Sequence, residues 1–321
     1  MSTAADAGLL RLLAELWLHE PDAAMVARAQ RVLGLPPADP AELAIAYVDV
    51  LLNSVYPYGT SFTDPWGEIN TSEAEAMYER FAQHGFDAPA LREVGAPDHI
   101  GICLQFLAHV GREGDIAFNT QLLRWAPALC IAIAREPGGH SFYKALAEHT
   151  CAALMAIALP VDRRWLAASR FDLVMPPLAD LASDWATDGF IPIADVDDEA
   201  REVRLKDIVR FLLLAERSGL FLSRARIGYL ANRLGIRLPF LPRLMLGELL
   251  FTAAGEEGRL DDLMALLRDE IAGWREAYAD VARAWPAWSD YAELWGVRLT
   301  NSATLLDGMR RIIEDNPIEE G

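Results

Sequence analysis

Cysteine is scarce in this sequence of 321 residues, and its positions exclude the common cysteine chemistries. Cys103, Cys130 and Cys151 are too few and too far apart for a disulfide framework or a CxxC metal site. Each lies among apolar residues, where a free cysteine behaves as a small buried hydrophobe. We therefore expect three buried thiols and a reducing compartment, the cytoplasm.

Catalytic signatures are also missing. The sequence has no GxGxxG, P-loop, GxSxG or HExxH motif, and its six histidines show no pair at metal-ligand spacing on one helix. Asp98 and His99 are neighbours, so on a helix their side chains point about 100° apart and do not form a simple pair of base and orienting group. We expect no catalytic residue, no metal and no cofactor, and keep an enzyme that uses Asp98 and His99 as an alternative.

Long apolar runs are lacking as well. The longest, such as ALCIAIA at 128–134, fall short of the roughly 20 residues that span a bilayer. The N-terminus has no basic leader, and Asp6, Glu15 and Glu20 lie in or beside its apolar stretch, which is not the pattern of a secretory signal. We expect a globular, cytoplasmic protein without stable membrane insertion.

Positive charge is in deficit, because the formal net charge is −18. Binding a phosphate backbone needs a basic face, so we expect no nucleic-acid partner. The segment LSRARIGYLANRLGIRLP at 222–239 resembles a helix-turn-helix, but an ordinary helix followed by a turn explains it as well. A cationic partner suits the acidic chain, unless the charge serves only solubility.

Apolar residues recur at helical spacing almost everywhere, and alternating β-branched runs are scarce. The pattern predicts an all-α fold, with an N-terminal helical domain over 1–158, a connector over 159–196 and a C-terminal helical extension over 197–321. The connector mixes proline, aspartate and aromatic residues with weak periodicity. The predicted helices cover 6–18, 23–33, 41–54, 72–84, 97–111, 115–135, 140–158, 197–216, 224–234, 241–254, 259–284 and 288–313.

Two stretches stand out as candidate sites. VYPYGTSFTDPWGEI at 55–69 places many aromatic residues in a loop, which is unusual unless something covers them. APDHIGICLQFLAHV at 96–110 predicts a helix with Pro97 at its first position and Asp98 in its first turn. Asp98, Gln105 and His109 are spaced to form a narrow polar stripe on that otherwise apolar helix.

The order of these and other motifs resembles the TorD/DmsD/NarJ family of cytoplasmic chaperones for molybdoenzymes. The resemblance spans residues 10 to about 158. Its motifs are YPYGTS, then HGF at 84–86, APDHIG, LQFLAHV, LLRWAP at 122–127 and SFYKALAEH at 141–149.

The resemblance implies an all-helical, TorD-like bundle that binds the twin-arginine signal peptide of a molybdopterin-containing oxidoreductase, or its apo form, until the cofactor is inserted. The chain would act by protein binding and not as an enzyme, and a homodimer is possible. Trp125 and Pro127 match a helix-interior motif with a structural role. The family's peptide-binding residues correspond here to Tyr56, Pro57, Tyr58, Ser61, Pro97, Asp98 and His99.

Two departures from the family pattern limit the carry-over. Cys103 stands where many relatives have an acidic residue, which removes one possible contact for an arginine. Residues 159–321 match nothing in the family.

The chemistry of a twin-arginine peptide fits the same stretches. Such a peptide is cationic and has an apolar part, so its receptor needs carboxylates beside an apolar groove. We expect Asp98 to accept an arginine, and Tyr56, Tyr58 and Trp66, with Gln105 nearby, to contact the rest. An acidic helical scaffold without a peptide groove is the alternative.

Overall fold

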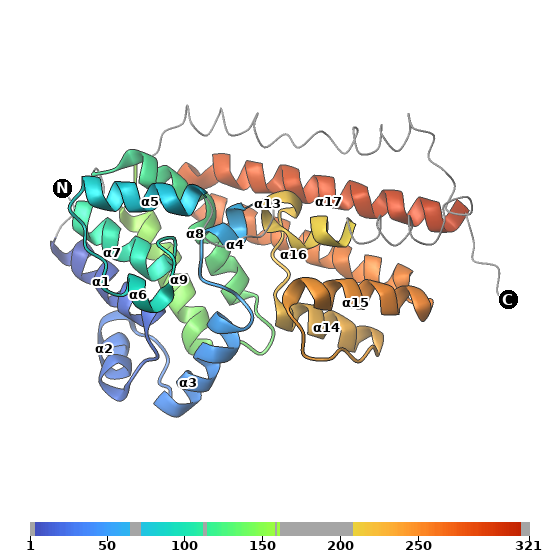
Figure 1. The fold of residues 1–321 in the computed structure, drawn as a ribbon, viewed down its shortest axis with the longest axis horizontal. Helices are drawn as coiled ribbons and strands as arrows, with labels where there is room; N and C mark the ends of the chain where they lie inside the picture. Colours follow the sequence, from blue (N-terminus) through green and yellow to red (C-terminus); the bar gives the residue numbers. More distant parts are fainter. Residues whose placement is uncertain (1–3, 65–71, 112–113, 158, 161–207, 316–321) are drawn as a thin grey trace. The chain divides into compact units, whose positions relative to one another are not determined.

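The computed structural model describes residues 4–64, 72–111, 114–157, 159–160 and 208–315. These residues form helices joined by loops, which confirms the all-α prediction (Figure 1). Within the described ranges the β-structure consists of an isolated antiparallel bridge between Tyr58 and His99. The chain divides into two compact units, Met1–Arg163 and Arg164–Gly321, and each is considered by itself.

Helices and loops alternate along the described residues of the first unit. A π-helical turn, Val48–Leu52, extends α3. The helices are α1 (Ala4–Leu18), α2 (Ala23–Leu33), α3 (Pro40–Tyr47), α4 (Thr60–Thr63), α5 (Ser72–Gln83), α6 (Leu91–Val94), α7 (Ile100–Val110), α8 (Ile116–Ala134) and α9 (Ser141–Ile157).

Side-chain caps explain why several predicted boundaries are correct. Asp22 and Asp115 accept the backbone N–H groups of the first turns of α2 and α8. Gly34 ends α2 with a φ of 68°, a conformation that glycine adopts without a Cβ penalty. Local chemistry therefore fixes these helix ends.

The core of the first unit is built around α7, α8 and α9. Helix α8 is long and apolar enough to cross a membrane by length and composition alone, but 83% of its most apolar window is buried inside the protein. Helix α1 packs on α7 and α9, and the indole N–H of Trp17 donates to Thr150 at 2.9 Å. A Cβ on Gly101 would lie 2.5 Å from Leu18 Cγ, so glycine permits the close approach of α7 to α1.

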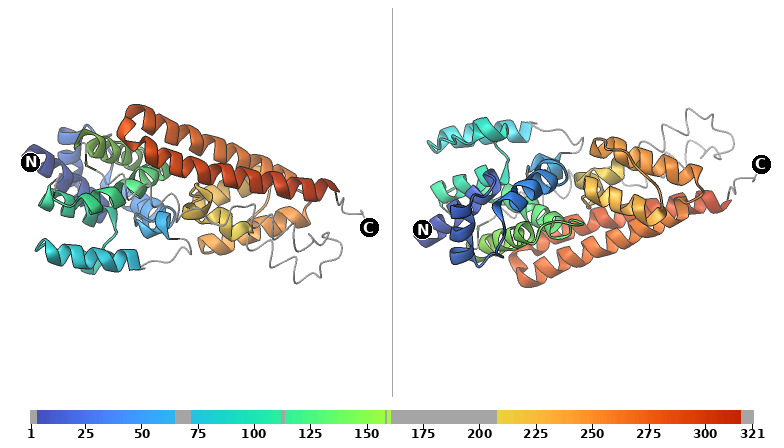
Figure 2. Two further views of the ribbon diagram at one scale, coloured as in Figure 1. Left: turned by 90° about the horizontal axis from the view of Figure 1, so that it is seen from above. Right: turned by 90° about the horizontal axis from the view of Figure 1, so that it is seen from below.

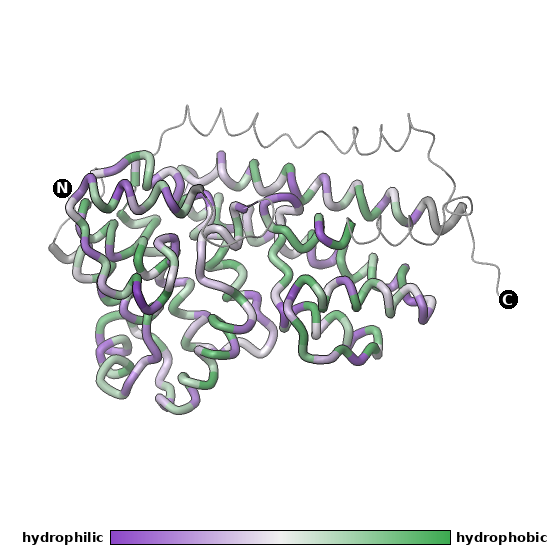
Figure 3. The backbone as a smooth tube through the Cα atoms, in the orientation of Figure 1, coloured by the Kyte–Doolittle hydropathy of each residue, from purple (hydrophilic) through white to green (hydrophobic). Residues whose placement is uncertain are grey.

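The second unit contains α13 (Ala215–Ser218), α14 (Arg224–Leu234), α15 (Arg243–Glu256), α16 (Leu260–Ala284), a 3₁₀ turn (Pro286–Trp288) and α17 (Ser289–Asp315). Helices α16 and α17 lie side by side along most of their length (Figure 2). Hydropathy alternates along both helices, as expected when one stripe of each is buried (Figure 3). Trp274 and Tyr278 of α16 and Trp295 of α17 form an aromatic cluster with Trp288 of the 3₁₀ turn.

A buried ion pair ties α13 to α17. The guanidinium of Arg298 donates to the side chain of Glu216 at 2.7 Å and to its backbone carbonyl at 2.5 Å. Gly219 follows α13 with a φ of 80°, and a Cβ there would lie 2.8 Å from the backbone of Leu299. Both the backbone conformation and the space therefore require glycine at this turn.

The structure corrects several predicted boundaries. The helix predicted over 97–111 begins at Ile100, so neither Pro97 nor Asp98 lies inside it. The helix predicted over 197–216 is interrupted at Leu214, which has an extended backbone and precedes α13. The sequence analysis missed the short helices α4 and α6. The connector beyond residue 160 and Trp66 lie outside the described residues.

Candidate functional site

The two stretches singled out in the sequence meet through their backbones. The N–H of Ile100 donates to the carbonyl of Pro57 at 2.9 Å, and the N–H of Gly59 donates to the carbonyl of Asp98 at 3.0 Å. These bonds form the isolated bridge and hold the aromatic-proline loop, residues 55–59, against the start of α7. The structure thus places Tyr56, Pro57, Tyr58, Pro97, Asp98 and His99 in one region.

Asp98 is buried, with 4% of its surface exposed, and it organises the start of α4. Its Oδ2 accepts the backbone N–H of Thr60 at 2.7 Å. A carboxylate is a strong acceptor for an N–H at a helix start, where the backbone donors have no partner within the helix. Asp98 therefore fixes the direction in which the chain leaves the aromatic-proline loop.

His99 is the N-cap of α7 and is 2% exposed. The N–H of Gly101 donates to its Nδ1 at 3.1 Å, and its ring meets the ring of Tyr58 edge to face with centroids 5.1 Å apart. Burial, and then the nearby His19, lower the pKa of His99 from 6.5 to about 3. The imidazole is neutral near pH 7, and its Nδ1 lone pair is already used.

The tyrosines of the loop are half-buried. The hydroxyl of Tyr58 donates to the carbonyl of Val94 at 2.8 Å, and burial, followed by the charge of Asp98, raises the pKa of this hydroxyl. Ser61 is also half-buried, whereas Pro57 and Pro97 are buried. Solvent therefore reaches Tyr56, Tyr58 and Ser61 but very little of the two prolines.

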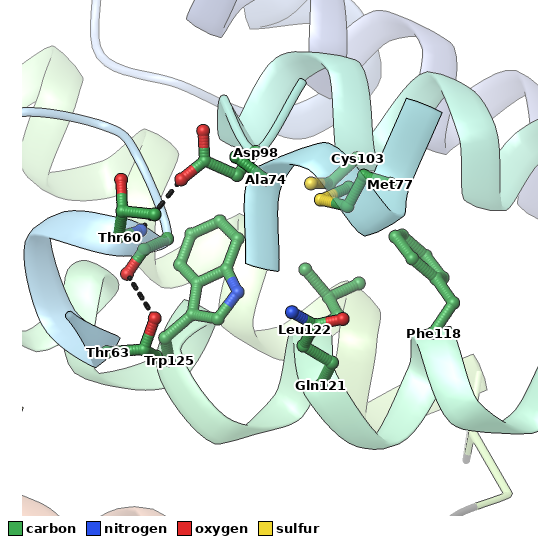
Figure 4. A pocket seen from close by; sticks show the side chains of 11 residues that line it. Thr60, Thr63, Ala74, Met77, Asp98, Cys103, Phe118, Gln121, Leu122 and Trp125 are labelled. Carbon is green, nitrogen blue, oxygen red and sulfur yellow. Dashed lines mark hydrogen bonds between the residues drawn. The ribbon is translucent and has the colours of Figure 1, made fainter. Parts of the chain in front are cut away.

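A small pocket lies behind the loop (Figure 4). Its volume is about 10 Å³, which accommodates a single water molecule and not a guanidinium group. Asp98 contributes to its wall from the loop side, and α5 and α8 close the other sides. The lining residues are Gly59, Thr60, Thr63, Ala74, Met77, Asp98, Cys103, Phe118, Gln121, Leu122 and Trp125.

Trp125 forms the floor under the loop. It is buried, and a Cβ added to Gly59 would lie 2.8 Å from its Cε2 atom. Gly59 has an ordinary φ of −58°, so the glycine is needed for space and not for backbone freedom. This contact was not foreseen, although Gly59 lies inside the motif YPYGTS.

Gln105 and His109 line a different, open cleft. The cleft has a volume of about 310 Å³ and lies over α1, α7 and the turn after α5. The predicted polar stripe of Asp98, Gln105 and His109 is wrong, because Asp98 precedes α7 and is buried at the other pocket. The residues that line the open cleft are Arg11, Glu15, Phe86, Asp87, Gln105 and His109.

The HGF motif anchors α5 to the core. Arg80 and His84 of α5 and its following turn reach the carboxylate of Asp115 at 3.0 and 3.5 Å. Phe81, Phe86, Phe106 and Phe118 pack their rings together below this ion pair. The motif has a structural explanation, and it holds α5 where Ala74 and Met77 close the small pocket.

Within the described ranges, no cluster of three or more histidine, cysteine, aspartate or glutamate side chains is arranged to hold a metal ion. The site consists instead of a braced loop with two half-exposed tyrosines. Such a surface is suited to binding a chain segment.

Comparison with known families supports the resemblance seen in the motifs. Residues 18–130 match the family described as the nitrate reductase delta subunit, which comprises NarJ/TorD-like chaperones. The match spans the aromatic-proline loop, α7 and the part of α8 that carries Trp125 and Pro127. Neither the curated proteins nor the solved structures give a match to this chain.

Proposed function

We propose that this chain, whose N-terminal half matches the NarJ/TorD-like chaperones, is a cytoplasmic maturation chaperone for a molybdopterin-containing oxidoreductase. It binds the twin-arginine signal peptide or the apo form of the catalytic subunit before cofactor insertion and export. One observation carries the proposal: the family match covers the loop and the helix start that two backbone hydrogen bonds join into a single surface.

The proposed contact surface divides into two kinds of residue. Tyr56, Tyr58 and Ser61 are half-exposed and contact the client, together with Trp66. Pro57, Pro97 and His99 are buried and hold that surface in place. Tyrosine suits this role because it offers a large contact area at a low cost in side-chain entropy.

Asp98 supplies the negative charge at the base of the proposed surface. Its carboxylate is bound to the N–H of Thr60, and the adjacent pocket is too small for a guanidinium. A client arginine therefore pairs with Asp98 only when Thr60 or α5 moves away from it. While the carboxylate of Asp98 remains bound to the N–H of Thr60, it attracts a cation only through its electrostatic field.

Binding is favoured over catalysis at this site. A general base needs a free lone pair and a pKa near the working pH. His99 has its Nδ1 engaged by Gly101 and a pKa of about 3, so it is a poor candidate. This argues against the alternative of an enzyme that uses Asp98 and His99.

Calorimetric titration tests the proposal with a synthetic peptide that carries two adjacent arginines followed by an apolar stretch. Asp98→Asn removes the negative charge but keeps an oxygen that accepts the N–H of Thr60, so it should weaken binding by about 1–3 kcal/mol and leave the melting temperature nearly unchanged. The matched control is Asp87→Asn, which removes an exposed carboxylate from the open cleft of the same unit.

The two variants separate the possible sites. Equal affinity of Asp98→Asn and the wild type, at equal melting temperature, removes Asp98 from the site. A loss confined to Asp87→Asn moves the arginine to the open cleft. Absence of peptide binding by the wild-type chain contradicts the proposed recognition of the signal peptide.

A further inference from the structure

The second unit contains a stretch whose charge is opposite to that of the whole chain. Between residues 217 and 247 there are six arginines and no aspartate or glutamate, although the chain carries a net charge of −18. These residues include α14, the loop over 235–242 and the start of α15. A cluster of positive charge on an otherwise acidic protein favours an anionic binding partner at that surface.

The loop over 235–242 runs back along α14. It leaves the C-terminal end of α14 at Gly235 and brings Phe240 to the opposite end, where the guanidinium of Arg224 lies 3.9 Å from the centre of the phenylalanine ring (Figure 1). Arg237 lies exposed on the same loop. The helix and the loop therefore lie together, and each carries arginine side chains.

Arg233 and Arg237 are exposed and Arg224 is half-buried, whereas Arg226 and Arg243 are bound within the unit. Arg226 pairs with Glu270 at 3.3 Å, and Arg243 donates to the carbonyl of Leu213 at 2.6 Å. In the other group, the guanidinium of Arg224 lies over the ring of Phe240, and that of Arg233 lies near the ring of Tyr229 and donates to its hydroxyl at 3.1 Å. The third member, Arg237, is exposed on the loop.

Large apolar side chains accompany these arginines. Phe240 is 80% exposed and sits between Pro239 and Pro242, and Met245 on the first turn of α15 is 53% exposed. Tyr229 on the outer face of α14 is 39% exposed. We call Arg224, Tyr229, Arg233, Arg237, Phe240 and Met245 the basic-aromatic surface.

We propose that the basic-aromatic surface docks the protein peripherally on an anionic lipid bilayer. Arginines at such a surface pair with lipid phosphates, while exposed phenylalanine and methionine side chains enter the boundary between headgroups and acyl chains. The remainder of the acidic chain is repelled by the same bilayer, so docking occurs with this surface facing the lipid.

The observations favour a bilayer over a nucleic acid. A helix-turn-helix joins its helices by a turn of about 3–4 residues, whereas Gly235–Pro242 separate α14 from α15 here. An exposed phenylalanine on a loop between prolines has no phosphate-backbone role, but it gains free energy on leaving water for lipid. The proposal does not depend on the proposed chaperone function.

Vesicle co-sedimentation of the full chain tests the proposal. We expect binding to vesicles of phosphatidylcholine mixed with phosphatidylglycerol, weaker binding at high salt, and little binding to phosphatidylcholine alone. Arg224→Gln and Arg237→Gln should each lower the partition coefficient about fivefold, and Phe240→Ser about tenfold. The matched controls are Arg31→Gln and Ile45→Ser, which alter an exposed arginine and a 65% exposed isoleucine of the first unit.

A second readout locates the contact. Because Cys103, Cys130 and Cys151 are buried, Phe240→Cys offers an accessible thiol for an environment-sensitive dye, whose emission should shift to the blue on anionic vesicles. The proposal is overturned if the wild type does not bind anionic vesicles at low salt, or if the surface variants bind as well as the controls. Displacement of the protein from vesicles by double-stranded DNA or polyglutamate at lower concentrations than free anionic lipid also overturns it.

Discussion

Asp98 and His99 are neighbours in the chain with separate tasks. Asp98 binds the backbone of Thr60 and sets the exit from the aromatic-proline loop, whereas His99 binds Gly101 and starts α7. Their backbones form the bridge to the same loop. An adjacent pair of polar residues thus controls two helix starts and joins the segments between them.

The buried imidazole of His99 makes stability depend on pH. The unfolded chain protonates this side chain near pH 6.5, whereas the folded protein does so only near pH 3. Between these values the unfolded state binds the extra proton, so the free energy of unfolding falls as the pH is lowered from about 6.5. The contribution of His99 is about 1.4 kcal/mol per pH unit within that window.

Replacement by asparagine isolates this effect. His99→Asn retains a side chain that caps helices well but loses the ring contact with Tyr58, so its stability at pH 7 should fall by about 1–3 kcal/mol. Urea unfolding at several pH values should show a shallower loss of stability for the variant. If the free energy of unfolding changes with pH by the same amount in both proteins between about pH 4 and pH 6.5, His99 is not the titrating group.

Gly59 tests the contact between the loop and its floor. Gly59→Ala places a Cβ against Trp125, and we expect a loss of about 1–3 kcal/mol in the free energy of unfolding together with weaker client binding. Gly296→Ala is the control, because a Cβ there has open space within a helix and should be neutral or stabilising. Thermal unfolding and peptide titration measure both, and equal behaviour of the two variants would contradict the packing argument.

Sequence patterns predicted the helices well where boundary signals are local. Asp22, Asp115 and Ser223 cap helices that begin where the sequence places them, and Gly34 and Gly235 end two of them. The prediction was wrong at Pro97 and Asp98, because the Pro-Asp pair has the composition of a first turn. The N-cap of α7 is instead the side chain of His99. Backbone hydrogen bonds to residues about 40 positions earlier set the direction of the chain just before this helix.

The candidate site shows the same division between local and distant causes. The resemblance to the TorD/DmsD/NarJ family implied that Tyr58, Asp98 and His99 line one region, and the structure places them together. It did not separate Gln105 from Asp98, because that separation depends on where α7 begins. The short helix α4 depends on a hydrogen bond to Asp98, which lies far along the chain, so the local sequence does not predict this helix.

Helix α1 depends on a close approach to α7. Gly101→Ala would bring a Cβ to 2.5 Å from Leu18 Cγ and 3.1 Å from the carbonyl of Ala14, so the two helices must separate. We expect a loss of about 1–3 kcal/mol in the free energy of unfolding, measured by urea titration. Gly255→Ala in α15 serves as the control, since nothing lies within 4 Å of its added Cβ.

At the scale of the whole molecule, each compact unit has its own buried polar links. Trp17 and Thr150 join α1 to α9 in the first unit, and Arg298 and Glu216 join α17 to α13 in the second. Both units also carry a buried apolar core. This is the expected anatomy of two domains.

We therefore predict that residues 1–158 and 197–321 fold as separate polypeptides. Each should show a cooperative thermal transition by far-UV circular dichroism, and the first should retain peptide binding. A fragment that lacks a cooperative transition would show that its core needs the rest of the chain, and would contradict the division proposed from the sequence.

The sequence separation between Trp17 and its partner Thr150 determines how long part of α1 stays uncovered during synthesis. Thr150 lies 133 positions after Trp17, and at about 5–20 residues per second it is synthesised on the order of ten seconds later. Until then the apolar side of α1 has no α9 to cover it. Once α7 has been synthesised, the side of α1 that packs on α9 therefore still lacks its partner, and this is the part of the young chain that general chaperones would be expected to bind.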